Sequence, residues 1–518
     1  MRVLQLGEQN WKELYQIEND LEWHFNDFAE FYQKEINSDN EKGNNKARQK
    51  NFDVVIITGK NNMSSQDWEK LHSLVLSHHV LYMPDVIENI DESTNYFLKS
   101  LSAQPISEEP QELINKLLGR YFGGQSGLRI FPTELMLNSQ VITDFEYVDA
   151  GHLKLNLDTN NEWISIGTYK SNLYIDPNKL INFWLSMKNN NFEVRLRIFT
   201  QDWGTSESVK DQRLLNLDTY DQDDYYSQLK IAKKARISSI NIEVKGSGDL
   251  TIGIFHSRWG RDGIGILMPG GERIIDPVNR DDIAYLFNRG DMKPPLNVYF
   301  SGAREKEGFE GFYLFNNLQA PSLLFTDMRL SVGAFYDDKS GYIGKEIKRV
   351  INEKLAELGF DSSQLVMNGI SMGTYPALKY GAQLQAYAIN VAKPLTNLGY
   401  ISTRMALERP DEFETICDID NNLVDSLNKK ELQKLDEKFW QEFNRQDLSK
   451  TRLFVGYMKN DDYDDHAIQD LSESPVVKKS LQFSTQGFTG RHNDDPMVNN
   501  WFIARLNEIL KDFGREKS

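Results

Sequence analysis

The chain has 518 residues, a formal net charge of −17, 40% hydrophobic residues and 26% charged residues. This length and ordinary globular composition predict roughly two to four domains with buried cores. The acidic balance argues against nucleic-acid binding as the main role. The sequence also lacks the run of about 18 apolar residues that a membrane span requires.

The single cysteine, Cys417, excludes an internal disulfide framework and fits a reducing compartment. The N-terminal residues "MRVLQLGEQNWKELYQIEND" have neither the basic region nor the apolar region of a signal peptide. We therefore expect a cytoplasmic protein, for which peripheral contact with a membrane is compatible with the sequence.

Residues 1–138 mix strand and helix signals. "DVVIITG" (53–59) is a β-branched apolar run typical of a buried strand, and "HVLYMPD" (79–85) predicts the next strand. Between them, "SSQDWEKLHSLVLS" (64–77) predicts a helix begun by a serine cap. This order predicts a Rossmann-like α/β region. The region has no G-x-G-x-x-G motif, so it gives no support to nucleotide binding.

Residues 139–270 alternate apolar and polar side chains in short runs. Examples are "FEVRLRIFT", "SSINIEVKG" and "DLTIGIFHS", the last two separated by the turn-forming residues "KGSGD". This pattern predicts a β-sandwich, an architecture that often binds carbohydrate. Four tryptophans would either stack on sugars or fill the core, and burial tendencies favour the core. They are Trp163, Trp184, Trp203 and Trp259.

Residues 271–518 alternate apolar strands with amphipathic helices, which predicts a mostly parallel sheet covered on both faces. The charged segment 403–447 interrupts this alternation and predicts a helical insertion over the sheet. The predicted strands are "NVYFSG" (297–302), "SLLFTD" (322–327), "QLVMNG" (364–369), "AYAINVA" (386–392), "RLFVGYM" (452–458) and "SLQFST" (480–485).

The motif Gly369-Ile370-Ser371-Met372-Gly373 lies between a predicted strand and a predicted helix. This context is typical of a nucleophile elbow, in which a tight turn exposes the serine hydroxyl above the sheet. The N–H of Met372 would point to the place where an oxyanion forms. A second donor is expected from the loop "SGAREKEG" (301–308), either the backbone N–H of Gly302 or that of Ala303. Arg304 would assist them or lie on the surface.

A serine nucleophile needs a base, and the base needs an orienting acid. Asp461 and Asp462 follow a late strand, and we favour Asp461 because it comes first, with Asp462 as the alternative. His492 lies between the last strand and the final helix, which completes the chain order Ser, acid, His of an α/β-hydrolase. His466 begins a predicted helix and ranks below His492.

No metal site and no bound cofactor are predicted. The acidic run 461–465 lacks the glycine and distal glutamate of a calcium-binding EF-hand loop, and the chain has no C-x-x-C or H-E-x-x-H motif. The predicted serine chemistry would instead require an acyl donor, whose identity the sequence does not define.

Three stretches carry a family resemblance: "MNGISMGTYPALKYGAQLQAYAINVAKPLTNLG" (367–399), "YMKNDDYD" (457–464) and "GRHNDD" (490–495). Together with the three-part organisation, they resemble the second accessory secretory protein of Gram-positive accessory Sec systems. The resemblance implies a cytoplasmic protein that is peripheral at the inner face of the membrane and forms a complex with two other accessory secretory proteins. It also implies delivery of a glycosylated serine-rich-repeat adhesin to a dedicated SecA motor.

The resemblance further implies O-acetylation of N-acetylglucosamine on that adhesin by a Ser–acid–His triad. Carried over to this sequence, the nucleophile is Ser371 and the base is His492. The acid is glutamate in some relatives, and the matching position here is Asp461, which is chemically adequate for orienting an imidazole. Two other functions stay open: a non-catalytic adaptor or chaperone for adhesin export, and a plain serine esterase.

Overall fold

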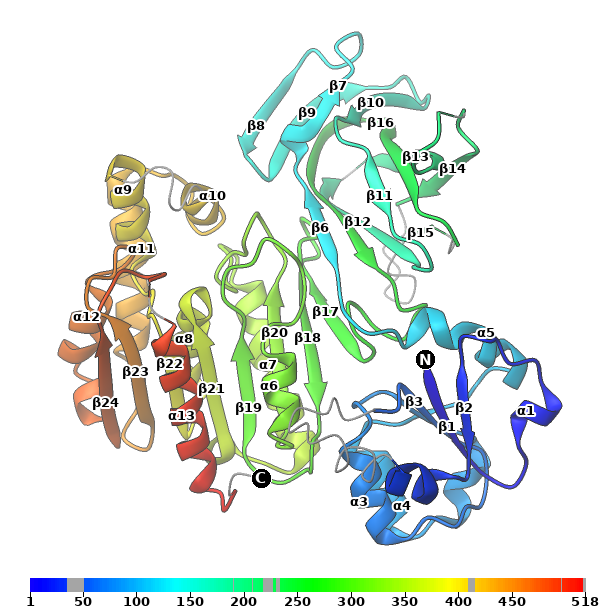
Figure 1. Ribbon diagram of the computed structural model, residues 1–518. Helices are drawn as coiled ribbons and strands as arrows, with labels where there is room; N and C mark the ends of the chain where they lie inside the picture. Colours follow the sequence, from blue (N-terminus) through cyan, green and yellow to red (C-terminus); the bar gives the residue numbers. More distant parts are fainter. Residues whose placement is uncertain are drawn as a thin grey trace.

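The computed structural model describes residues 1–34, 51–189, 191–206, 208–217, 227–229, 233–408, 415–494 and 496–515. Three β-sheets follow one another along the chain. In Figure 1 the first sheet lies at the lower right, the second at the top and the third at the left. The third sheet carries the predicted site residues.

The first sheet has five strands in the order β2-β1-β3-β4-β5, and all its pairs are parallel. Successive residues of β3 point to opposite faces, so Val55 and Ile57 enter one core while Val54 and Ile56 enter another. The predicted α/β region is thus confirmed. Its strands are β1 (Arg2–Leu6), β2 (Glu22–Phe25), β3 (Val54–Ile57), β4 (Val80–Tyr82) and β5 (Gln104–Pro105).

Helices connect these strands and cover the two faces of the sheet. The helix predicted from "SSQDWEKLHSLVLS" begins as expected, because Ser64 and Asp67 form a reciprocal capping box. The helices are α1 (Trp11–Leu14), α3 (Ser65–His72), α4 (Glu92–Ser100), α5 (Pro110–Arg120) and the 3-10 helix η1 (Pro84–Asn89).

The second sheet is antiparallel and curls around its own core. The long strand β16 (Arg236–Trp259) joins its two layers: its first half pairs with β13 and β10, and its second half pairs with β12 and β9. The prediction of a turn at "KGSGD" is wrong, because β16 continues through these residues. Gly246 and Gly248 adopt positive φ there, so the strand bends and its pairing continues.

This sheet also begins before the predicted boundary at 139. β6 and β7 pair with β16 and β10, but they are too short to show a clear alternation in the sequence. The other strands and one 3-10 helix are β6 (Gly127–Ile130), η2 (Pro132–Glu134), β7 (Leu135–Leu137), β8 (Phe145–Asp149), β9 (His152–Asp158), β10 (Ile164–Tyr169), β11 (Leu173–Ile175), β12 (Ile181–Asn189), β13 (Phe192–Asp202), β14 (Asp211–Asn216) and β15 (Ser227–Leu229).

The four tryptophans of this region differ in their surroundings. Trp184 is buried, and its indole N–H donates to the carbonyl oxygen of Arg280. Trp259 packs against the core and donates to Asp176. Trp203 is 56% exposed and touches the ring of Tyr174 edge-on. The core interpretation therefore fits Trp184 and Trp259, whereas Trp203 lies on the surface. Trp163 is half-buried, with the guanidinium of Arg195 3.9 Å from its ring centroid.

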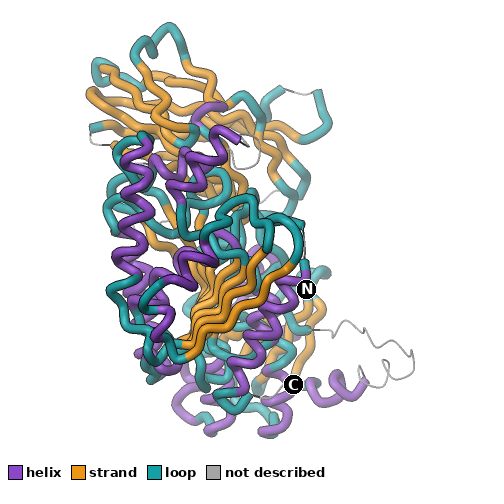
Figure 2. Tube along the Cα trace, turned by 90° about the vertical axis from the view of Figure 1, so that its left-hand side faces the viewer, coloured by secondary structure: helices purple, strands orange, loops and turns teal. Residues whose placement is uncertain are grey.

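The third sheet has eight strands in the order β17-β18-β20-β19-β21-β22-β23-β24. The pairs β17–β18 and β18–β20 are antiparallel and all the others are parallel. This mixed sheet, with helices on both faces, confirms the predicted α/β-hydrolase-like fold (Figure 2). Its strands are β17 (Gly271–Ile275), β18 (Asp282–Asn288), β19 (Leu296–Phe300), β20 (Ser322–Asp327), β21 (Leu365–Ile370), β22 (Ala388–Ala392), β23 (Arg452–Met458) and β24 (Gln482–Phe488).

Alternate residues of β19 show how the helices cover this sheet. Phe300 packs in the core with Ile347 of α7 and Tyr380 of α8, whereas Tyr299 packs on the other face with Phe502 of α13. The helices are α6 (Phe312–Asn317), α7 (Tyr342–Leu358), η3 (Ser362–Gln364), η4 (Ser371–Gly373), α8 (Thr374–Gln383), α12 (Ala467–Glu473), η5 (Val477–Lys479) and α13 (Met497–Lys511).

Three helices lie between β22 and β23, where the insertion 403–447 was predicted. They are α9 (Leu398–Glu408), α10 (Ile416–Asn421) and α11 (Lys429–Phe443), and residues 409–414 of the predicted insertion lie outside the described residues. The division of the chain into domains at 138 and 270 stays a prediction.

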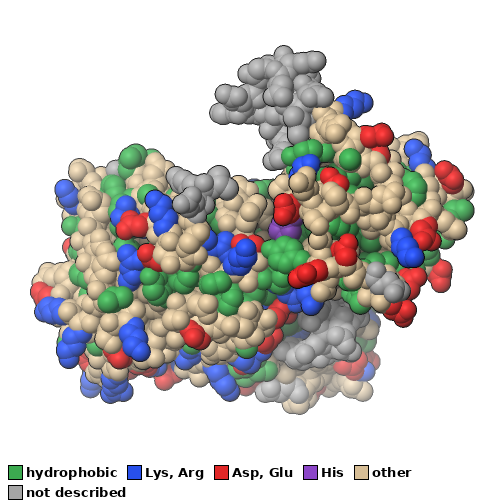
Figure 3. Space-filling model, turned by 90° about the horizontal axis from the view of Figure 1, so that it is seen from below, with side chains coloured by type: hydrophobic (Ala, Val, Ile, Leu, Met, Phe, Trp, Pro, Cys, Tyr) green, Lys and Arg blue, Asp and Glu red, His purple; other side chains and the backbone are tan. Residues whose placement is uncertain are grey.

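One face of the molecule carries hydrophobic side chains among charged ones of both signs. Figure 3 shows the face seen from below, on which basic and acidic side chains are interspersed. Among the described residues, no helix is both long enough and apolar enough to cross a membrane.

A histidine joins the second sheet to the third. His152 on β9 contacts the carboxylate of Asp149 at 2.8 Å and that of Asp281, which precedes β18, at 4.0 Å. Burial lowers the pKa of His152, but the hydrogen bond with Asp149 and the charges of Asp281, Asp149 and Asp418 outweigh it and raise the pKa to about 9.

This shift predicts a loss of stability at high pH. A raised pKa contributes stability below the unfolded value of 6.5 that is lost as the pH rises through about 9. The contribution is about 3 kcal/mol at roughly 1.4 kcal/mol per pKa unit. Between about pH 6 and pH 9.5, we expect the melting temperature of wild type to fall more than that of His152→Gln. The control is His466→Gln, which changes a mostly exposed histidine and should behave as wild type. Equal falls in the melting temperature of wild type and of His152→Gln would contradict the interpretation.

Candidate active site

Ser371 stands at the turn between β21 and α8. β21 ends at Ile370 with extended backbone, Ser371 itself has a φ of 54°, and the chain then enters η4 and α8. A left-handed backbone is strained for a serine, and it is a mark of the nucleophile elbow. The turn leaves Ser371 half-buried.

The two motif glycines allow the chain to approach itself closely. A Cβ on Gly369 would lie 2.1 Å from the carbonyl oxygen of Gly373. A Cβ on Gly373 would lie 2.1 Å from the carbonyl oxygen of Phe300 on β19. Both contacts are with backbone atoms, so a side chain at either position would displace the elbow from the sheet.

The structure brings Ser371, His492 and Asp461 together. The Oγ of Ser371 lies 2.9 Å from Nε2 of His492, and Nδ1 of that ring lies 2.9 Å and 3.2 Å from the two carboxylate oxygens of Asp461. Both His492 and Asp461 are buried. With the Nδ1 proton directed to the carboxylate, Nε2 is free to accept the serine proton.

The structure separates the two candidate acids by their contacts. Asp462 accepts a hydrogen bond from the backbone N–H of His492 at 2.9 Å, whereas Asp461 contacts the ring. Asp462 therefore fixes the loop that carries the histidine. The ring of Tyr463 stacks on the imidazole of His492, with centroids 4.4 Å apart and an interplanar angle of 18°. Three successive residues after β23 thus hold one histidine.

The predicted oxyanion donors differ in the hydrogen bonds that their N–H groups already make. Met372 is at the start of η4, where helix amides have no intrahelical partner. A Cβ on Gly302 would lie 3.9 Å from Cβ of Ser371, but the N–H of Gly302 donates to the carboxylate of Glu310 at 2.8 Å. Among the described residues, the N–H of Ala303 has no hydrogen-bond partner. The geometry thus favours Ala303 over Gly302 as the second donor.

Arg304 and the remaining histidines have other contacts. The N–H of Arg304 donates to the carbonyl oxygen of Val332. His466 directly precedes α12, and its ring packs on that of Tyr400. His78 contacts the carbonyl oxygen of Phe287, and His79 contacts that of Asp53 while burial lowers its pKa to about 4. These contacts give the histidines structural roles outside the Ser371 cluster.

The acidic run after β23 is held by the protein itself. Asp464 accepts hydrogen bonds from the backbone N–H groups of Thr396 and Asn397 at 2.7 Å and 2.9 Å. Within the described part of the chain, no group of three or more His, Cys, Asp or Glu side chains is arranged to hold a metal ion.

Sequence reasoning missed Glu310 and Tyr463. Tyr463 lies within "NDDYDD", directly after the candidate acids, so its position was visible but its stacking was not. Glu310 follows Gly302 by eight residues and also accepts from the hydroxyl of Tyr299 at 3.0 Å. Only the folded loop places this carboxylate on the Gly302 amide.

Comparisons with known proteins extend over nearly the whole chain. A family model described as an accessory Sec system GspB-transporter matches residues 1–515. The chain belongs to the accessory Sec system GspB-transporter family. The resemblance seen in the sequence is thereby confirmed.

Curated members and a solved structure give the same assignment. An accessory Sec system protein of Staphylococcus aureus is 33% identical and spans 99% of this chain and 97% of its own length. One of Streptococcus gordonii is 32% identical and spans 100% and 99%. A chain of the Glycosylation Associate Protein complex of Streptococcus agalactiae superposes with a TM-score of 0.89 at 30% identity and spans 100% of this chain and 99% of that one.

Replacement of Gly373 by alanine should damage the elbow. The added Cβ must push against the backbone of Phe300, and such overpacking costs about 1–3 kcal/mol. We expect Gly373→Ala to lower the melting temperature, measured by thermal unfolding. Gly123→Ala is the matched control because a Cβ there meets no atom within 4 Å. If the two variants melt at the same temperature, Gly373 does not have the role described.

Proposed function

We propose that the chain is a serine-dependent O-acetyltransferase. The observation that carries this proposal is the continuous hydrogen-bonded set of Ser371, His492 and Asp461 at the carboxyl edge of the third sheet. His492 takes the proton from Ser371 as its Oγ attacks the carbonyl carbon of an acyl donor. Asp461 holds the ring with Nδ1 protonated and stabilises the imidazolium that forms.

The oxyanion formed in this attack would be bound by backbone amides. The N–H of Met372 is one donor, and the N–H of Ala303 is the other. The leaving group departs with the proton from His492, which leaves an acetyl ester on Ser371. A sugar hydroxyl then gives its proton to His492 as its oxygen attacks the acetyl carbonyl. The bond from the acetyl group to Ser371 breaks, and His492 passes the proton to the Ser371 oxygen, so the enzyme returns to its starting state.

The acceptor we propose is N-acetylglucosamine on a glycosylated serine-rich-repeat adhesin. Membership of the family supports this assignment, as does the relative in a complex named for glycosylation. We further propose that the chain works with two other accessory secretory proteins, at the cytoplasmic face of the membrane, and delivers the adhesin to its SecA motor. A complex is supported by the relative's own assembly.

The described architecture also supports a role in export without chemistry. Ser371, His492 and Asp461 all lie on loops of the third sheet, so binding of an adhesin or a partner protein by the first two sheets needs none of them. This second function is compatible with the first on one chain. Measurement of export and acetylation in the same variant separates the two.

Substitution of the nucleophile is the direct test. We expect Ser371→Ala to abolish acetylation of co-expressed adhesin, measured by mass spectrometry of its glycans, with an unchanged melting temperature. Retained acetylation in Ser371→Ala would overturn the enzymatic proposal. Loss of export together with acetylation would count against an independent adaptor role.

The two aspartates provide a matched pair. Asp461→Asn keeps the shape of the side chain, but the amide no longer holds the His492 proton on Nδ1. The ring then takes the tautomer protonated at Nε2, which cannot accept the serine proton, so kcat should fall by about 10⁴. Asp462→Asn keeps an oxygen acceptor for the His492 backbone N–H, so kcat should stay within about tenfold of wild type. Steady-state turnover of a small acetyl ester measures both, and equal losses would contradict the assignment of Asp461.

A further inference from the structure

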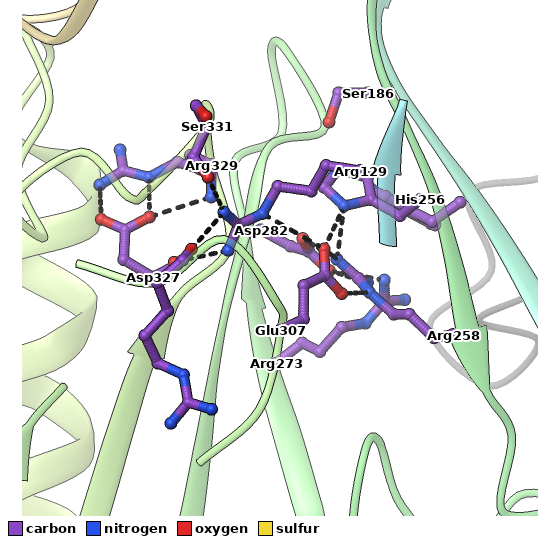
Figure 4. Close-up of polar contacts among 12 residues, drawn as sticks. Arg129, Ser186, His256, Arg258, Arg273, Asp282, Glu307, Asp327, Arg329 and Ser331 are labelled. Carbon is purple, nitrogen blue, oxygen red and sulfur yellow. Dashed lines mark hydrogen bonds and ion pairs between the residues drawn. The ribbon is translucent and has the colours of Figure 1, made fainter. Parts of the chain in front are cut away.

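A buried cluster of charged side chains lies where the second sheet meets the loop after β19 (Figure 4). Glu307 of this loop has a fully buried carboxylate that pairs with Arg258 and, at 2.5 Å, with His256, both on β16. Arg258 also pairs with Asp282 of β18 at 2.7 Å. Burial raises the pKa of Glu307, but the charges of Arg258 and His256 outweigh it and lower the pKa to about 2. The loop is thus held by a charged anchor.

Arg129 on β6 reaches across this cluster to two loops of the third sheet. Its side chain is 2% exposed. One terminal nitrogen donates to the carbonyl oxygen of Arg304 at 2.8 Å and also to that of Ser331. The other donates to the carbonyl oxygen of Asp327 at 3.4 Å, and Nε lies 3.6 Å from the carboxylate of Glu307.

Both loops touch the elbow. Ala303, the candidate oxyanion donor, directly precedes Arg304, whose carbonyl oxygen accepts from Arg129. The second loop passes over the residue after Ser371, since a Cβ on Gly333 would lie 2.6 Å from Cε of Met372. The two loops also bond to each other, from the N–H of Arg304 to the carbonyl oxygen of Val332 at 3.1 Å.

The start of β6 and the segment before it make further hydrogen bonds to the loop that follows β19. The N–H of Glu307 donates to the carbonyl oxygen of Gly127 at 3.2 Å. The side chain of Gln125 accepts from the N–H of Phe309 at 2.8 Å and donates to its carbonyl oxygen at 3.0 Å. Residues 125–129, at the start of the second sheet and just before it, therefore fix the loop at Arg304, Glu307 and Phe309.

We propose that Arg129 is a positioning residue for acyl transfer: from β6 it holds the loop that presents the Ala303 amide to the oxyanion. This inference rests on the proposed function and extends it, because it makes the second sheet part of the catalytic architecture. Arginine suits the position because its planar fork donates to several carbonyl oxygens at fixed angles. A lysine would keep the positive charge beside Glu307 but would lose this geometry.

The test compares Arg129→Lys with wild type in turnover of a small acetyl ester by the full chain. We expect kcat to fall by about tenfold to hundredfold, since a small misplacement of a catalytic donor has effects of this size. KM should stay within about twofold, and the pH midpoint of kcat should not move, because His492 and Asp461 keep their contacts. Arg195→Lys is the matched control: Arg195 pairs with Glu243 on the same sheet and has no contact with the loop.

Each result has a defined meaning. Unchanged kcat in Arg129→Lys, or a change in KM alone, overturns the inference. If Arg129→Lys does not fold, Gln125→Leu takes its place, because it removes the two hydrogen bonds to Phe309 without touching the charged cluster. Reduced kcat at constant KM in Gln125→Leu supports the inference, and unchanged kcat overturns it. If wild-type turnover is absent or survives in Ser371→Ala, the proposed function fails instead, so the two failures are distinguishable.

Discussion

The site depends on the parallel alignment of β19, β21, β23 and β24. Parallel strands end at the same edge of a sheet, so loops far apart in the sequence meet there. The loop after β21 carries Ser371, the loop after β23 carries Asp461, and the loop after β24 carries His492. Residues 121 positions apart in the chain thereby come within 2.9 Å of each other.

Close backbone contact sets the geometry of the elbow within that alignment. Gly373 lies against the carbonyl oxygen of Phe300, which ties the turn after β21 to the end of β19. The same contact brings the candidate donor loop 301–311 beside the serine. Two neighbouring strands thus place the Ser371 hydroxyl beside the proposed oxyanion donors, whose fixed amides would need no reorganisation when charge develops.

The second sheet is joined to this arrangement by charge rather than by apolar packing alone. Arg129, Arg258 and His256 enter a fully buried cluster with Glu307 and Asp282. Breaking one partner of such a cluster leaves an uncompensated buried charge, so the relative position of the two sheets is strongly specified. His152 makes a second, smaller connection between them.

The sequence by itself determined the fold class, the family and the order of Ser371, acid and His492, because these depend on local periodicity and on motifs at strand ends. It did not decide between Asp461 and Asp462 as the acid, or between Gly302 and Ala303 as the second oxyanion donor, since neighbouring residues have the same local signals. Only the tertiary structure decided which carboxylate contacts the ring, which amide Glu310 occupies, and that β16 continues through "KGSGD". These features arise from contacts between distant segments, whose distances no local pattern encodes.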